Sequence, residues 1–320
     1  MKKYFLPSIV SLFLFWSCDK IDNPIPEGLG NTIRLDSNIE YIVDPSLNIT
    51  TASELENLLA NSNWGDSIVS PNNSTQRFIV IEEFTGHTCI NCIPGTKEIV
   101  RLDSIYGDQL IPIGIHAGTF AELRPPKYIV DFRPPSGFGE TIFDEFNPEK
   151  ANPRGVVNRQ TTAAGNAKSL SEWSKDIKLV ENDAPVASLQ IKNFFDSSAK
   201  ILRTNLEIEW LVTRPESYNV QLQVLEDHII AYQKDAQDPR IDIPDYDHRH
   251  VLRKFVNGER GKQLDTANVN STEIIEYIYP MIETLQPNNN KNVEVVAFIY
   301  FQDGGTTEIV QGNAAYIVNK

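Results

Sequence analysis

The 320-residue sequence has only three cysteines and only one long apolar run, which lies at its start. Because no second run approaches 20 apolar residues, we expect that the chain does not cross a membrane as helices. Internal repeats and low-complexity segments are also missing. No Ser-His-Asp set, phosphate-binding glycine loop or pair of carboxylates at helical spacing stands out. Neither a hydrolase nor a kinase is therefore indicated.

Positive charge is scarce as well: 29 Lys and Arg stand against 43 Asp and Glu, for a formal net charge of −14. Loss of Lys2 and Lys3 with the first segment would take the charge to −16. A chain this acidic is not expected to bind nucleic acid or an anionic membrane surface. With 41% hydrophobic residues there is ample apolar material for cores, and the length indicates two domains.

The first segment indicates export from the cytoplasm. Two lysines are followed by an apolar run too short for a permanent membrane helix, which ends just before Cys18. Residues 1–17 resemble a bacterial lipoprotein signal, which would make Cys18 the lipidated first residue. The alternative is an ordinary signal peptide that is cut nearby. Residues 18–30 are polar and rich in Pro and Gly, so we expect a flexible tether.

The other two cysteines, Cys89 and Cys92, form the most informative motif. Two cysteines placed at random in about 300 positions would fall at this spacing only roughly 1% of the time. At a helix start such a pair can close a small, reducible disulfide, and the helix N-terminus lowers the pKa of the first thiol. Outside the cytoplasm dithiols tend to be oxidised. A redox site is the leading hypothesis.

The first half of the chain shows an alternation of strand and helix patterns. We expect a buried strand at 77–83, a helix at 89–106 and a second buried strand at 110–115. This strand–helix–strand order implies a parallel pair. Residues 119–150, broken by prolines and glycines, are expected as an insertion or lid rather than a core element. A strand at 155–158 and an amphipathic helix at 169–180 follow.

The pattern changes after residue 184. Five segments show β-like alternation, with turn signals between many of them: 186–191, 201–212, 218–226, 293–301 and 308–317. This pattern is typical of an antiparallel sandwich. The predicted fold class is therefore α/β plus all-β, with one domain at 31–183 and a β-sandwich at 184–320.

Two stretches carry a resemblance to known proteins. Val80-Ile-Glu-Glu-Phe-Thr-Gly-His-Thr-Cys-Ile-Asn-Cys92 looks like the strand, loop and CxxC of thioredoxin-fold proteins, and Asn152-Pro-Arg-Gly-Val-Val157 looks like their cis-proline loop. This likeness spans roughly residues 75–183. Over its whole length the chain resembles a family of Bacteroidetes outer membrane lipoproteins named for a twenty-eight-kilodalton outer membrane protein. The stretches that suggest it are Glu82 to Cys89 and Tyr246-Asp-His-Arg-His-Val-Leu-Arg253.

The thioredoxin likeness implies a role for each site residue. Cys89 would be the exposed attacking thiolate and Cys92 the buried resolving thiol. Glu83 would accept the Cys92 proton if burial raises its pKa. Pro153 would face the pair through a cis bond. His87 is near enough in sequence to modulate the Cys89 thiolate.

The alternative is a structural disulfide. Thr88 stands where thioredoxins usually have Trp, and the inner pair Ile90-Asn91 matches no common oxidoreductase. Zinc is disfavoured because one CxxC supplies only two of four ligands. No metal or other cofactor is expected.

Two further groups of residues are weaker candidates. Asp and His residues cluster around Tyr246, namely Asp242, Asp245, Asp247, His248 and His250. Such residues can hold Ca²⁺ or Zn²⁺, but the spacing matches no calcium loop, so a solvated turn before a strand at 251–255 is favoured. His116 ends the second parallel strand, where it would line the site or pack in the core.

These patterns predict an outer membrane lipoprotein with a thioredoxin-like domain followed by an immunoglobulin-like β-sandwich. Its leading function is thiol–disulfide exchange on envelope or extracellular proteins. The alternative function is a surface-displayed binding or assembly module with a structural disulfide. The protein would lie in the cell envelope, facing the periplasm or the medium.

Overall fold

A computed structural model of the protein describes residues 30–36, 38–160, 166–236, 241–303 and 306–319. The predicted signal segment 1–17, Cys18 and nearly all of the tether lie outside these described residues. The fold is mixed α/β, with mostly sheet and few helices. None of the helices in the described ranges has the length and apolar character needed to cross a membrane.

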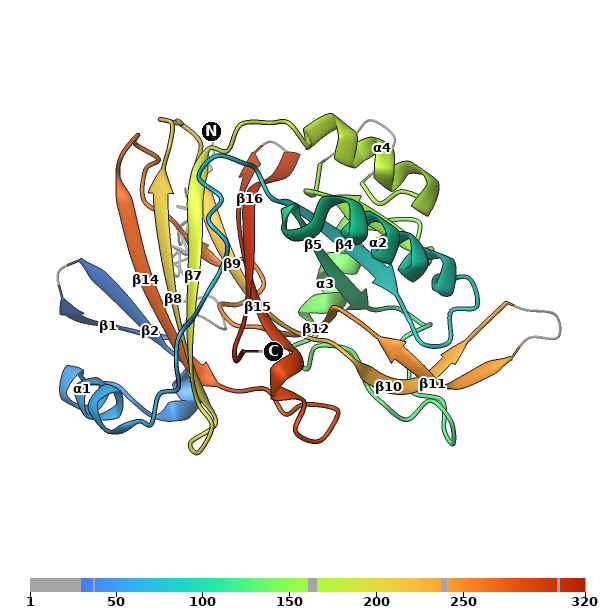
Figure 1. Ribbon diagram of the computed structural model, residues 1–320, viewed down its shortest axis with the longest axis horizontal. Coiled ribbons are helices and arrows are strands. Elements are labelled where there is room, and N and C mark those ends of the chain that lie inside the picture. The colour runs from blue at the N-terminus through green and yellow to red at the C-terminus, as the bar shows by residue number, and fades with distance from the viewer. Residues whose placement is uncertain (1–29, 37, 161–165, 237–240, 304–305, 320) are drawn as a thin grey trace, which may run out of the picture.

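The first sheet is six-stranded, in the order β1-β2-β14-β8-β7-β3. Its strands are β1 Asn31–Asp36, β2 Ile39–Val43, β14 Thr272–Pro280, β8 Ile201–Trp210, β7 Ala187–Asp196 and β3 Ile68–Val69. Helix α1, Ala52–Asn61, lies beside β1 and β2 (Figure 1), and Thr51 with Glu54 forms its capping box. The N-terminal segment therefore belongs to the sheet built mainly from the second half of the chain.

The second sheet has eight strands, in the order β16-β15-β9-β12-β5-β4-β6, with β13 beside β9. Its strands are β4 Ile79–Thr85, β5 Leu110–His116, β6 Arg154–Val157, β9 Tyr218–Glu226, β12 Val251–Phe255, β13 Lys262–Gln263, β15 Val293–Asp303 and β16 Thr306–Tyr316. As predicted, β4 and β5 are parallel, and α2 connects them. Strand β6 runs antiparallel to β4.

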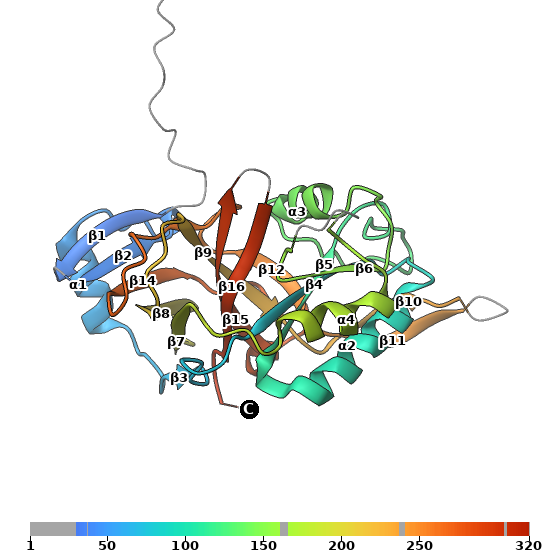
Figure 2. The same ribbon diagram turned by 90° about the horizontal axis from the view of Figure 1, so that it is seen from above.

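The main helices cover the β4–β5–β6 part of this sheet on both faces. Helices α2, Cys92–Tyr106, and α4, Leu170–Val180, lie on one face, and α3, Phe138–Phe146, lies on the other (Figure 2). A separate hairpin, β10 Ile229–Lys234 and β11 Asp242–His248, extends below them (Figure 1). Short 3₁₀ helices occupy Pro45–Leu47, Gly107–Gln109 and Asn289–Asn292.

Strand β15 connects the two largest hydrophobic cores, because its side chains alternate between two faces. One face packs against the six-stranded sheet with Val295, Ala297 and Ile299. The other packs toward α3 and β4 with Val296, Phe298 and Tyr300. A single sheet thus crosses residue 184, and the division into domains 31–183 and 184–320 stays a prediction.

Two sequence predictions are wrong. Residues 119–150 do hold a core element, because α3 buries Ile142, Phe143 and Phe146; the prolines and glycines around it obscured this helical apolar spacing. Residues 242–248 are strand β11 rather than a solvated turn, and His248 is buried. Pairing with β10 supplies the backbone hydrogen bonds that make this polar segment a strand.

Candidate functional site

The cysteine pair lies where β4 passes into α2. Strand β4 is buried along its whole length, and a short loop leads from it to Cys89. The Cys89 N–H donates to the carbonyl of Gly86 at 3.0 Å, which turns the chain toward the helix. Helix α2 begins at Cys92, so Cys92, and not Cys89 as expected, opens the helix. The two cysteines form a disulfide, with 5.5 Å between their Cα atoms.

Both cysteines are buried. Cys89 is 2% exposed and Cys92 is 1% exposed, so the prediction of an exposed Cys89 is wrong. The physical reason is a cover supplied by segments distant in sequence, which no local pattern reveals. A thiolate attack requires access to a sulfur atom. In this arrangement the disulfide is closed to a protein substrate.

One part of the cover is the end of strand β10. The side-chain amide of Gln233 donates to the carbonyl of Cys89 at 3.0 Å. The backbone N–H of Lys234 donates to the carbonyl of His87 at 2.9 Å. The hairpin from the second half of the chain is thus hydrogen-bonded to the loop that carries the pair.

The other part of the cover is the loop around Phe120. The backbone N–H and the hydroxyl of Thr88 both donate to the Phe120 carbonyl, at 3.1 and 3.0 Å. A Cβ placed on Gly86 would lie 2.5 Å from the Phe120 carbonyl, so only glycine allows this close approach. The chain after β5 therefore also holds the loop before the cysteines.

Glu83 lies under the start of α2. Burial raises the pKa of its carboxyl to about 8, the direction that the role implied by the thioredoxin likeness requires. Its Oε1 atom has no hydrogen-bond partner among the described residues. A Cβ placed on Gly95 would lie 2.6 Å from that oxygen and 3.0 Å from the Cβ of Pro153. Gly95 thus allows the helix to approach both residues.

Pro153 follows a cis peptide bond with Asn152, as the proline-loop pattern indicated. It directly precedes β6, in which Gly155 pairs with Glu83 of β4. The Asn152 side chain donates to the carbonyl of Thr85 at 3.3 Å, which joins the proline loop to the end of β4. The sequence-predicted Glu83 and Pro153 are therefore brought together at the N-terminal end of α2.

Three histidines surround the ring of Phe132. His116 stacks on it at 4.5 Å between ring centroids, His248 lies at 4.4 Å and His87 at 5.6 Å. Burial lowers the pKa of all three, to about 4 for His248. His87 also makes a 2.8 Å hydrogen bond with the Glu122 carbonyl. Its influence on Cys89 stays a prediction.

A small cavity of about 30 Å³ lies beside Glu83, with room for about two water molecules. His116 and His248 line it, together with Thr96 and Tyr246. Tyr246 of β11 and Thr96 of α2 thus lie at the same cavity. Gln233 and Tyr246 are the site residues that sequence reasoning missed, because nothing local indicates that this hairpin reaches the cysteines.

Two acidic residues of the hairpin, Asp242 and Asp247, pair with basic or aromatic neighbours. Asp242 contacts Lys127 and Tyr128, and Asp247 pairs with His228 at 3.0 Å. Within the described ranges, no group of three or more His, Cys, Asp or Glu residues is arranged to hold a metal ion.

Comparison with protein families gives a match over residues 143–317 to the family described as outer membrane protein Omp28. This range is more than half of the chain. The chain belongs to this family. Membership places the protein among the outer membrane proteins of the cell envelope. The matched range begins after Cys89 and Cys92, so it carries no information about the chemistry of the pair.

Two solved structures are similar to the fold. HBP35 of Porphyromonas gingivalis aligns with a TM-score of 0.53 and 14% identity, over 77% of this chain and 76% of that chain. A protein of Agrobacterium tumefaciens aligns with a TM-score of 0.47 and 10% identity, over 76% of this chain and 95% of that chain. At 14% identity the first likeness shows the fold alone. No curated protein matches the chain.

Proposed function

We propose that this Omp28-family protein is an outer membrane lipoprotein that performs thiol–disulfide exchange through Cys89 and Cys92. In this proposal Cys18 carries the lipid, residues 31–183 form a thioredoxin-like domain and residues 184–320 an immunoglobulin-like β-sandwich. The substrates are disulfide-bonded proteins of the envelope or the medium.

The observation that carries the proposal is the environment of Glu83. A buried carboxyl with an unpaired oxygen destabilises a fold, and a disulfide that only staples the chain has no use for one. Perturbed carboxyls of this kind concentrate at functional sites. With a pKa near 8, Glu83 is close to the value at which a carboxyl exchanges protons effectively near neutral pH.

The exchange conserves atoms and electrons. In the reduced protein, the Cys89 thiolate attacks a substrate disulfide, forms a Cys89–substrate bond and releases one substrate thiolate. Glu83 takes the proton of Cys92. The Cys92 thiolate then attacks the Cys89 sulfur, closes the disulfide and releases the second substrate thiolate. The substrate gains two electrons and the protein loses two, and the reverse sequence oxidises a dithiol.

Because both sulfur atoms are buried, this exchange requires the site to open. The end of β10 has to separate from the loop before a protein substrate reaches Cys89. Three hydrogen bonds would be lost, because Gln233 and Lys234 donate to carbonyls of this loop. Each contributes about 1 kcal/mol net, so such an opening is within reach of thermal fluctuation or substrate binding.

A second function is favoured by the low exposure of the pair. A surface-displayed binding or assembly module would keep its disulfide closed, as a staple between β4 and α2. Burial at 2% and 1% fits that role. In that case the double variant Cys89→Ser, Cys92→Ser would lower thermal stability and leave partner binding unchanged.

A trapping experiment tests the exchange. The Cys92→Ser variant lacks the resolving thiol, so we expect mixed disulfides through Cys89 to accumulate in envelope fractions as reductant-sensitive bands of higher mass. The double variant Cys89→Ser, Cys92→Ser is the matched control. Adding Gln233→Ala to Cys92→Ser should increase the yield, because it weakens the cover. Equal band patterns for Cys92→Ser and the double variant would contradict the proposal.

A further inference from the structure

A cavity of about 740 Å³ lies away from the cysteine pair, between β12 and the segment after β14. Phe255, Ile282, Leu285 and Pro135 form its apolar wall. Five polar residues also line it: Ser136, Arg253, Lys254, Glu283 and Thr284. Ligand sites of small molecules have this volume and this composition, with an apolar wall and a few polar groups that fix orientation.

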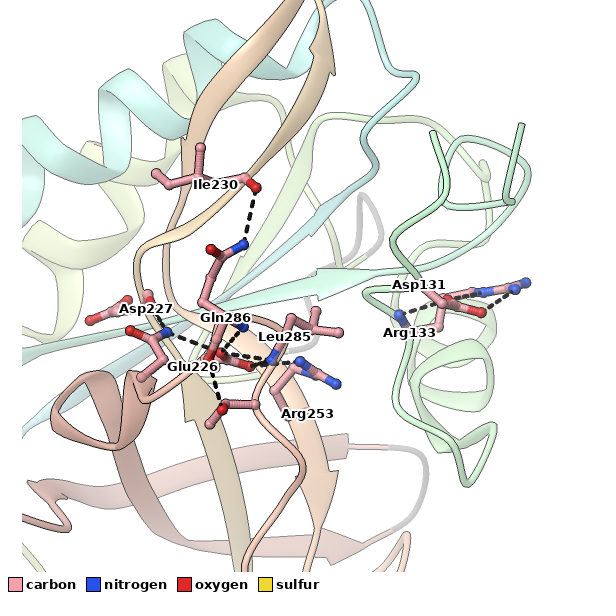
Figure 3. A network of polar contacts seen from close by, with 10 residues as sticks. Asp131, Arg133, Glu226, Asp227, Ile230, Arg253, Leu285 and Gln286 are labelled. Carbon is pink, nitrogen blue, oxygen red and sulfur yellow. Dashed lines mark hydrogen bonds and ion pairs between the residues drawn. The ribbon is translucent and has the colours of Figure 1, made fainter. Parts of the chain in front are cut away.

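Arg253 is the polar group of interest. Its side chain is 9% exposed, and one end nitrogen, Nη1, donates to Glu226 at 2.7 Å. The Nε atom has no hydrogen-bond partner, and among the described residues Glu226 is the only acceptor that Arg253 has. Figure 3 shows the guanidinium held by Glu226 at one end, with its other end directed away from that carboxylate.

Glu226 forms a hydrogen bond with only one nitrogen of the guanidinium, Nη1. Its carboxylate also accepts hydrogen bonds from the backbone N–H groups of Leu285 and Gln286 (Figure 3). The Asn289 side chain donates to it as well. Burial lowers the pKa of Arg253, although the charges of Glu226, Asp131 and Glu283 act in the opposite direction. Among the described residues, the Nε and Nη2 atoms of Arg253 thus have no acceptor, and Nε is fully buried.

We infer that this cavity binds a small amphiphile with one carboxylate head and an apolar tail. The head accepts a charge-assisted hydrogen bond from Nη2 of Arg253, because Nε is fully buried and Nη1 already donates to Glu226. The tail lies against Phe255, Ile282 and Leu285. A single negative charge fits best, because the exposed Glu283 also lines the cavity and would repel a second.

The neighbouring cation does not compete for the head. Lys254 lines the same cavity, but its ammonium pairs with Asp44 at 3.1 Å and lies over the ring of Tyr279. Arg253 is thus the basic group with unused donors. This inference rests on the cavity alone and is independent of the cysteine chemistry.

Calorimetric titration of the purified full-length protein with decanoate, below its micelle concentration, tests the inference. We expect one decanoate per chain. Decanol, which keeps the tail without the carboxylate, and butyrate, which keeps the carboxylate with a short tail, should each bind at least tenfold more weakly. Absence of decanoate binding, or equal binding of decanol, would overturn the inference.

Two variants separate the head site from the tail site. Arg253→Lys keeps a cation beside Glu226 but removes the free end nitrogen Nη2, and Ile282→Trp fills the cavity without changing Arg253. Each should weaken decanoate binding at least tenfold. Arg260→Lys, an exposed residue outside the cavity wall, is the matched control and should bind as the parent does. Should Arg253→Lys fail to fold, Ile282→Trp decides: unchanged affinity in that variant contradicts the site.

Discussion

Replacing Arg159 by methionine should lower the free energy of unfolding by about 3–5 kcal/mol, because it leaves the carboxylate of Glu82 buried without a partner. Both side chains are almost fully buried, and the guanidinium binds the carboxylate through two hydrogen bonds of 2.7 and 2.6 Å. The rings of Phe146, Phe298 and Tyr300 surround the guanidinium at 4.9 to 5.5 Å. The pair thus connects β4 with α3 and β15.

Urea unfolding followed by circular dichroism measures this effect. The double variant Glu82→Leu, Arg159→Met removes both charges, so it should recover most of the loss, since an apolar pair of similar volume often replaces a buried ion pair at little cost. The control is Arg101→Met, which removes the surface ion pair between Arg101 and Glu98 on α2. A loss below about 1 kcal/mol for Arg159→Met, the level of a surface pair, would contradict this role.

Replacing Glu83 by glutamine should stabilise the protein increasingly as the pH rises from about 4.5 to about 8. In the folded state burial holds the Glu83 pKa near 8, well above its ordinary value of 4.5. Between these two values Glu83 is ionised in the unfolded chain and protonated in the folded protein. The free energy of unfolding of the parent therefore falls as the pH rises, by up to about 1.4 kcal/mol per pH unit. Below pH 4.5 Glu83 is protonated in both states, so it adds no pH dependence to the free energy of unfolding.

The expected difference between Glu83→Gln and the parent is therefore small at pH 4.5 and roughly 3–5 kcal/mol at pH 8. Urea unfolding at pH 4.5, 6 and 8 measures it, with the exposed Glu207→Gln as control for the loss of one carboxyl. The buried histidines act in the opposite sense: their lowered pKa makes the fold lose stability as the pH falls below about 6.5. They are present in both proteins and cancel in the comparison. A difference that does not change with pH would show that Glu83 is ionised in the fold.

Local patterns predicted the parts of the site that local physics determines. The apolar run of β4, the helix after the cysteines and the parallel strand β5 follow from hydrophobic periodicity. Pro153 and Glu83 were indicated by the likeness to thioredoxin-fold proteins rather than by local patterns. The bond before Pro153 is cis, and Glu83 has a raised pKa because its strand is buried on both faces.

The rest depends on contacts between distant residues. Gln233 lies 144 residues from Cys89, and no periodicity connects them. The eight-stranded sheet could not be predicted for the same reason. Strand β12 pairs with β5, and β15 pairs with β9, through contacts between segments far apart in the sequence. It also explains why the sequence did not indicate Arg253: its free Nη2 can be recognised only once the positions of Glu226 and of the cavity are known.

The reduction potential of the Cys89–Cys92 pair tests the central proposal most directly. The full-length protein would be equilibrated in thiol–disulfide buffers of graded potential, unfolded in acid and alkylated, and the reduced fraction read by mass spectrometry. Exchange through this pair predicts a midpoint between about −270 and −120 mV, the range of thiol–disulfide oxidoreductases. A midpoint below about −300 mV, typical of structural disulfides in secreted proteins, would contradict exchange and favour the binding module with a closed staple.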